Sequence, residues 1–99
     1  MHNTLVVIPC GKSKIWKKEP HKGPTIAMEV YTGAPFKVNK EYVTHFEVDW
    51  VILSAKYGLI SPEFTILADY NVNFNDQSTN PVKIHELKEQ AKNITNTTA

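Results

Sequence analysis

Two short segments of this sequence carry most of the side chains that could do chemistry. Residues 10–14 read Cys-Gly-Lys-Ser-Lys and directly follow an apolar run, and residues 54–58 read Ser-Ala-Lys-Tyr-Gly and directly follow another. Both segments combine hydroxyl and ammonium groups, and the first adds a thiol. Ammonium groups attract anions, and hydroxyl groups donate or accept hydrogen bonds. The two segments therefore indicate a polar or anionic ligand, without naming a reaction.

The two apolar runs, residues 5–8 and 50–53, predict strands that are buried on both faces, as in a parallel sheet. Pro9 and Gly11 end the first strand, because proline lacks the amide hydrogen and glycine permits unusual backbone angles. A connection of strand, helix and strand is right-handed and makes the two strands parallel. Both polar segments should then leave the same edge of the sheet, where open α/β proteins bind their ligands.

Helices are expected before and after the second strand. Thr25 is a candidate N-cap for a short helix, and Pro35 suits the first turn of a longer one. Asn80 and Pro81 begin a final helix, whose apolar face continues to Ile94. In the longer helix, four apolar residues could share one buried stripe: Phe36, Tyr42, Val43 and Phe46.

These elements predict a single α/β domain over residues 1–99, built as a small three-layer, mostly parallel, Rossmann-like sheet. Residues 61–75 are too irregular to assign, and residues 95–99 should form a frayed tail. The final helix has an apolar face and no strand after it to cover, so the chain resembles a truncated form. An uncovered apolar face and the edge strand of a small sheet predict a homo-oligomer.

Two residues are candidates for a reactive, catalytic group. Cys10 could meet a histidine in space and act as a nucleophile, or it could be a small buried residue at a strand end. Asp69 is flanked by apolar and aromatic residues and could be a buried carboxylate near the ligand, or an exposed loop acid. The candidate ligand-binding residues are Gly11, Lys12, Ser13, Lys14, Ser54, Lys56, Tyr57 and Gly58.

One cysteine and scattered histidines give no zinc-binding spacing, so we expect neither a metal nor another cofactor. The single cysteine also excludes an internal disulfide and favours a cytoplasmic protein. No apolar run approaches the roughly 18 residues of a membrane span, so a membrane partner is not expected.

The lysines are unevenly distributed. Residues 1–24 hold five lysines and one acid, Glu19, whereas the rest of the chain holds six lysines and nine acids. This excess could keep a loop soluble, or it could contact phosphate groups or nucleic acid. The chain has no arginine, the usual bidentate ligand of guanine, so sequence-specific DNA binding is not expected. Contacts with nucleic acid that do not depend on sequence stay open.

Three segments together resemble small bacterial and phage proteins known as a domain of unknown function. They are residues 8–14 (Ile-Pro-Cys-Gly-Lys-Ser-Lys), residues 31–36 (Tyr-Thr-Gly, then Phe36) and residues 53–59 (Leu-Ser-Ala-Lys-Tyr-Gly-Leu). The resemblance covers about residues 4–75 and implies a relation to the peroxide-stress protein family, which has a similar Ser-Ala-x-Tyr-Gly segment.

The first strand end is also similar to the Pro-Cys-Ser-x-x-Lys segment of archaeosine synthase, which modifies 7-deazaguanine bases in transfer RNA. Gly11 replaces the serine here, and Ile15 and Trp16 replace the Pro-Tyr that follows the lysine. This similarity implies a nucleobase as ligand.

The leading hypothesis is thus a protein that binds or acts on a nucleotide or nucleobase, including modification or cleavage within nucleic acid. The sequence leaves open whether it is an enzyme. The alternative is a non-catalytic binding protein that sequesters a nucleotide signal or contacts a partner protein. A third hypothesis is a structural fragment with an incomplete site.

Overall fold

The computed structural model describes the backbone of residues 5–97 and the side chains of residues 5–94. The described chain combines helices with two small sheets, so the broad α/β class is confirmed. The elements in chain order are β1 (Leu5–Pro9), η1 (Ile15–Lys17), β2 (Thr25–Ile26), α1 (Ala27–Val30), α2 (Ala34–His45), β3 (Asp49–Ser54), β4 (Gly58–Ile60), β5 (Thr65–Ile66), η2 (Gln77–Thr79) and α3 (Ile84–Thr97).

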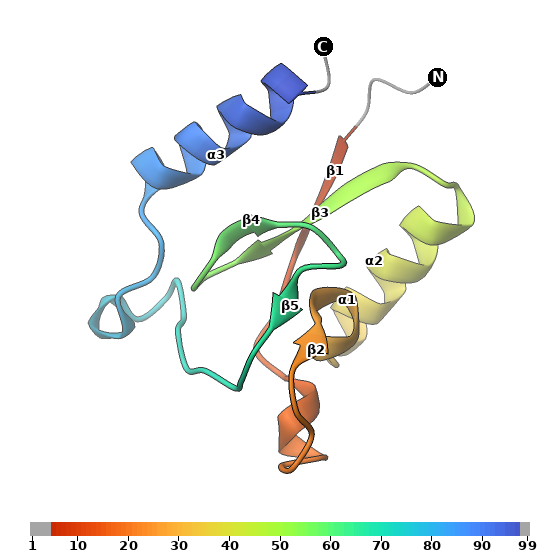
Figure 1. Cartoon of the computed structure of the whole chain (residues 1–99), viewed down its shortest axis with the longest axis vertical. Helices are drawn as coiled ribbons and strands as arrows, with labels where there is room; N and C mark the ends of the chain where they lie inside the picture. Colours follow the sequence, from red (N-terminus) through yellow and green to blue (C-terminus); the bar gives the residue numbers. More distant parts are fainter. Residues whose placement is uncertain (1–4, 98–99) are drawn as a thin grey trace.

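The main sheet has the strand order β1–β3–β4 (Figure 1). β1 and β3 are parallel, with Val6 opposite Trp50 and Ile8 opposite Ile52. This confirms the parallel pair that the two apolar runs predict. The amide of Cys10 donates to the carbonyl of Leu53 at 3.1 Å, so the pairing continues just beyond the end of β1.

The remaining strand pairs are antiparallel, so the predicted mostly parallel sheet is wrong. β4 follows β3 after three residues and folds back along it as a hairpin. Two strands joined by so short a connection cannot be parallel, because parallel strands need a long crossover between them. β2 and β5 form a separate antiparallel pair in front of the main sheet in Figure 1.

One face of the main sheet holds the core. Ile8 and Ile52 are 1% and 0% exposed and pack with Phe36 and Val43 of α2. On the opposite face of β1, Leu5 and Val7 remain 39% and 46% exposed. The predicted three-layer arrangement, with helices on both faces, is therefore not seen at β1.

The buried stripe predicted for α2 is half wrong. Phe36 and Val43 are buried, but Tyr42 and Phe46 are 61% and 54% exposed. Residues seven apart share a helix face, which puts Phe36 and Val43 toward the sheet. Val38, Tyr42 and Phe46 follow one another at four-residue spacing and form a second stripe on the solvent side, which we call the outer α2 stripe.

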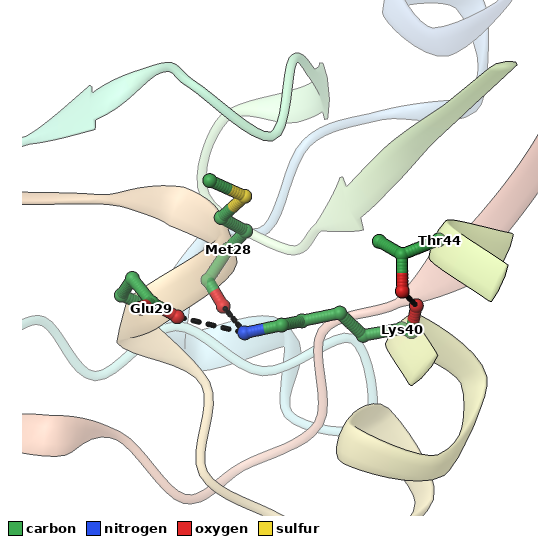
Figure 2. Close-up of polar contacts among 4 residues, drawn as sticks. All are labelled: Met28, Glu29, Lys40 and Thr44. Carbon is green, nitrogen blue, oxygen red and sulfur yellow. Dashed lines mark hydrogen bonds and ion pairs between the residues drawn. The ribbon is translucent and has the colours of Figure 1, made fainter. Parts of the chain in front are cut away.

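Lys40 fastens α2 to the single turn of α1. Its Nζ donates to the carbonyl of Met28 at 3.1 Å and pairs with the Glu29 carboxylate at 2.7 Å (Figure 2). Thr44 donates its hydroxyl to the carbonyl of Lys40 at 2.9 Å, one turn further along α2 (Figure 2). The short helix predicted after Thr25 is α1. It begins at Ala27, because Thr25 and Ile26 form β2.

α3 packs along β4 at one edge of the sheet (Figure 1). The side-chain amide of Gln90 accepts from the Leu59 amide at 2.9 Å and donates to the Tyr57 carbonyl at 3.0 Å. The helix begins at Ile84, later than the Asn80-Pro81 pair predicts, and it continues through residues 95–97, where we expected fraying. Residues 98–99 of the predicted tail lie outside the described residues. No helix in the described part of the chain has the length and apolar character needed to cross a membrane.

We predict that Gly58→Ala destabilises the fold. Gly58 has φ +81°, and a Cβ atom there would overlap the Gln90 side chain. Alanine at a positive φ should lower the free energy of unfolding by more than about 1 kcal/mol, measured by urea denaturation. Gly23→Ala is the matched control, since nothing lies near its Cβ position. Equal stability of the two variants would contradict the role of Gly58.

Self-association stays a prediction, and the fold indicates where to test it. β1 has a neighbouring strand on one side, in the part of the chain that the structure describes. Lysine blocks the pairing of edge strands, so Val7→Lys should shift the protein toward a monomer of 11.2 kDa in light scattering. Leu67→Lys, at a residue that is 71% exposed, should not. A wild-type monomer at micromolar concentration would show that the chain does not self-associate.

Candidate functional site

The carboxyl end of β1 turns sharply at Gly11. This glycine has φ +77°, a conformation that residues with a side chain rarely adopt. The turn carries Lys12 and Lys14 away from the sheet, while Cys10 stays half-buried against the end of β3. The thiol, the turn and the two ammonium groups therefore surround one corner of the sheet.

A cavity of about 300 Å³ lies at this corner. From the first polar segment, Cys10, Gly11, Lys12 and Lys14 line it. From the end of β3, Leu53 and Ala55 line it. Parallel pairing of β1 and β3 thus brings the two strand ends to one cavity, as the connectivity predicts.

The third wall of the cavity was missed at the sequence level. It is a run of residues with an asparagine at every second position: Asn71, Val72, Asn73, Phe74 and Asn75. Thr79 accepts a hydrogen bond from the Asn73 amide at 2.9 Å, and Ala55 accepts one from the Val82 amide at 2.7 Å. These bonds hold the loop against the end of β3. The alternation of asparagines was a signal that could have identified it, since it indicates one polar side of an extended segment.

Beside the cavity lies a chain of three hydroxyl groups, from the buried residues Tyr31 and Ser54 and the partly buried Tyr70. The Tyr31 and Tyr70 oxygens are 2.6 Å apart, and the Ser54 Oγ is 3.1 Å from the Tyr70 oxygen. Ser54 also accepts from the amides of Lys56 and Tyr57, both at 3.2 Å. Burial raises the pKa of Tyr31 and of Tyr70, so both hydroxyl groups are protonated at physiological pH.

The lysines around this chain have no acidic partner. Lys14 Nζ lies 4.4 Å from the centroid of the Tyr70 ring, and Lys56 Nζ lies 5.3 Å from it. Among the described residues, no carboxylate is within ion-pair distance of Lys12, Lys14 or Lys56. Uncompensated cations at a cavity favour an anionic ligand.

Cys10 is neutral in this environment. Burial raises the pKa of its thiol, although a backbone hydrogen bond from Ala55 and the charge of Lys14 act in the opposite direction. A protonated thiol is a weak nucleophile, because the thiolate is the reactive form. Cys10 is therefore placed to contact a ligand in the cavity but is not activated to attack it.

Several predicted site residues lie outside the cavity. Asp69 is exposed and accepts a hydrogen bond from the Tyr70 amide at 2.8 Å, so of its two alternatives the structure shows the exposed loop acid. Its flanking apolar residues do not enclose it, since Leu67 is 71% exposed. The other residues that do not line the cavity are Ser13, Ser54, Lys56, Tyr57 and Gly58.

These other residues shape the surroundings of the cavity. The Ser13 carbonyl accepts from the Thr32 amide, and Tyr57 packs on the Tyr70 ring with centroids 5.7 Å apart. Ser54 and Gly58 flank the turn between β3 and β4 and pair with each other across it. Within the described residues, no group of three or more histidine, cysteine or acidic side chains gathers in a way that could hold a metal ion.

We predict that Tyr70→Phe lowers the free energy of unfolding by about 1–3 kcal/mol, the usual cost of leaving buried hydroxyl partners unpaired. The variant keeps the ring and removes the oxygen that joins Tyr31 to Ser54. Tyr42→Phe removes a hydroxyl from a residue that is 61% exposed and should change stability little. Thermal or urea unfolding compares them, and a loss no greater in the Tyr70 variant would refute the structural role of the hydroxyl chain.

We also predict that Cys10 is alkylated slowly by iodoacetamide at neutral pH. The raised pKa lowers the thiolate fraction at every pH below it, so the rate at neutral pH should be low and should level off only at a pH above the usual pKa of a cysteine. The urea-unfolded protein, with an unperturbed thiol, is the control. Folded protein that reacts as fast as unfolded protein at neutral pH would overturn this prediction.

Comparison with known proteins places the chain in a family. It matches the model of a family of unknown function, DUF6884, over residues 5–98. It is 36% identical over 86 residues to the uncharacterised protein YfjM of Bacillus subtilis (strain 168). That match covers 87% of this chain and 57% of YfjM, so the chain spans little more than half of that relative. No solved structure matches it significantly. Because the family model covers nearly all of the sequence, the chain belongs to the DUF6884 family of unknown function.

Proposed function

We propose that the cavity at the ends of β1 and β3 binds a nucleotide or nucleobase. The observation that carries this proposal is its lining, which joins two lysines to three asparagine side chains and an aromatic ring. Neither lysine has a carboxylate partner among the described residues, and Lys14 donates to the Lys12 carbonyl at 3.3 Å. Its volume of about 300 Å³ is at the lower end of the range of small-ligand pockets, which suits a base and its sugar.

Each part of the lining suits one part of such a ligand. Lys12 and Lys14 supply positive charge for a phosphate group. An asparagine amide offers both a donor and an acceptor, which is what the edge of a base requires. Within the described residues, the side-chain amides of Asn71 and Asn75 make no hydrogen bond, so both are available to a ligand. The Phe74 ring is 37% exposed and offers a face for stacking.

The chemistry of the cavity favours binding over catalysis. Cys10 is neutral, Asp69 is exposed elsewhere, and no carboxylate of the described residues lines the cavity. A ligand held by charge and by amides needs none of these groups. We therefore propose a non-catalytic binding protein of the cytoplasm, and Cys10 as a contact for the ligand.

The similarity of residues 9–14 to the strand end of archaeosine synthase supports a nucleobase as the ligand class. The proposed relation to the peroxide-stress family rests on the Ser-Ala-x-Tyr-Gly resemblance of residues 54–58. In this chain, that segment forms the turn between β3 and β4.

We predict that Lys12→Gln weakens the binding of a nucleoside monophosphate by about tenfold, the usual effect of losing one charge-assisted hydrogen bond. Calorimetric titration of a panel of ribonucleoside monophosphates measures it. Lys88→Gln, on the exposed side of α3, is the matched control. Binding of the corresponding nucleosides should not depend on Lys12. Failure of every nucleotide, nucleoside and base to bind would overturn the proposal.

Binding of the monophosphates should also weaken as ionic strength rises, because Lys12 is exposed to solvent and its charge is screened. The same titration in added sodium chloride tests this. Affinity that does not change with salt would mean that the phosphate is not held by the lysines.

A further inference from the structure

A second cavity, of about 500 Å³, lies between η1, α1 and α2. Its wall carries four charged side chains, the ammonium groups of Lys22, Lys37 and Lys40 and the carboxylate of Glu29, and it also includes Ile15, Tyr31 and Thr32. None of them belongs to the cavity at the strand ends. The second cavity is larger and, in its named lining, has no asparagine, so it is less suited to reading a base.

The two cavities are separated by a single pair of backbone segments. Lys14 and Tyr31 form an isolated antiparallel bridge, and the Thr32 amide donates to the Ser13 carbonyl at 3.0 Å. Lys14 lines the first cavity, and Tyr31 and Thr32 line the second. The two cavities are therefore neighbours, with Lys14 of the first directly beside Tyr31 and Thr32 of the second.

The second cavity has its own unpaired cations. Lys40 is engaged by Glu29 and by the Met28 carbonyl, as Figure 2 shows. Lys22 and Lys37 are exposed and have no carboxylate within ion-pair distance among the described residues. Since Glu29 is paired with Lys40, Lys22 and Lys37 give the second cavity an excess of positive charge, as Lys12 and Lys14 do in the first.

We propose that the nucleotide in the first cavity is part of a single strand of nucleic acid, whose neighbouring phosphates lie along Lys22 and Lys37. This inference rests on the proposed function and extends it from a free nucleotide to a polynucleotide. A base can enter the first cavity only when it is unpaired and unstacked, which a single strand permits at the least cost. The chain has lysines but no arginine, and lysines contact phosphates as point charges without distinguishing one base from another. The site should therefore bind a single strand whatever its sequence.

Fluorescence anisotropy with a short labelled strand of DNA, and with the same strand as RNA, tests the inference. In Lys22→Gln/Lys37→Gln, the affinity for the strand should fall by about tenfold or more. The slope of log affinity against log salt should become shallower by about 1.4, because a single strand loses about 0.7 per phosphate contact. The affinity for a nucleoside monophosphate should stay within about twofold of wild type, since that ligand fits the first cavity alone. Lys83→Gln/Lys88→Gln removes two exposed lysines elsewhere and should change neither affinity.

The outcomes separate this inference from the proposed function. An unchanged affinity of Lys22→Gln/Lys37→Gln for both strands would overturn the inference, while a Lys12-dependent monophosphate affinity would keep the proposed function. Equal loss of strand and monophosphate would also overturn it, because the second cavity would then belong to the mononucleotide site. Duplex DNA or polyglutamate that competes as well as the single strand would exclude single-strand recognition. A loss of affinity in Lys22→Gln/Lys37→Gln for only the RNA strand, or only the DNA strand, would support the inference and identify which polymer is bound.

Discussion

The buried hydroxyl group of Ser54 is the contact on which the site depends. It accepts hydrogen bonds from two amides of the turn after β3 and bonds with the hydroxyl of Tyr70. The first two bonds set the direction in which the chain leaves the sheet, and the third holds the segment that leads into the asparagine loop. Leaving a buried hydroxyl group without a hydrogen-bond partner lowers the free energy of unfolding by about 1–3 kcal/mol, so these three contacts stabilise the fold. One small side chain thus joins the strand, the turn and the far wall of the cavity.

The fold could be predicted where a local pattern was sufficient. The runs at residues 5–8 and 50–53 identified β1 and β3, because a continuous apolar strand is recognisable without its partners. β4 is only three residues long, and its hairpin depends on the positive φ of Gly58 and on Gln90, which lies far along the chain. The pattern of α2 does not distinguish its buried side from its exposed side, because both sides carry aromatic residues. Which side faces the core is decided by the sheet.

The part of the site that directly follows a strand could also be predicted from the sequence. The residues around Gly11 were identified because they directly follow a strand, and they do line the cavity. The asparagine loop follows no strand of comparable length, so its place could not be derived from connectivity. Tyr31 and Tyr70 meet across 39 positions of sequence, a distance that no local pattern bridges. For Asp69 the sequence left burial and exposure open, and the structure shows exposure, because its apolar neighbours in sequence do not enclose it in space.

The two edges of the main sheet differ in a way that bears on how large an assembly can grow. At β4, the Gln90 amide occupies backbone groups of Leu59 and Tyr57, much as a further strand would. At β1, the described residues provide no such cover, and Pro9 removes one amide donor. A sheet with two open edges can add copies without limit, as a fibre does. A sheet with one open edge has none left once two copies pair through it, so any pairing of the main sheet through β1 would end at two copies.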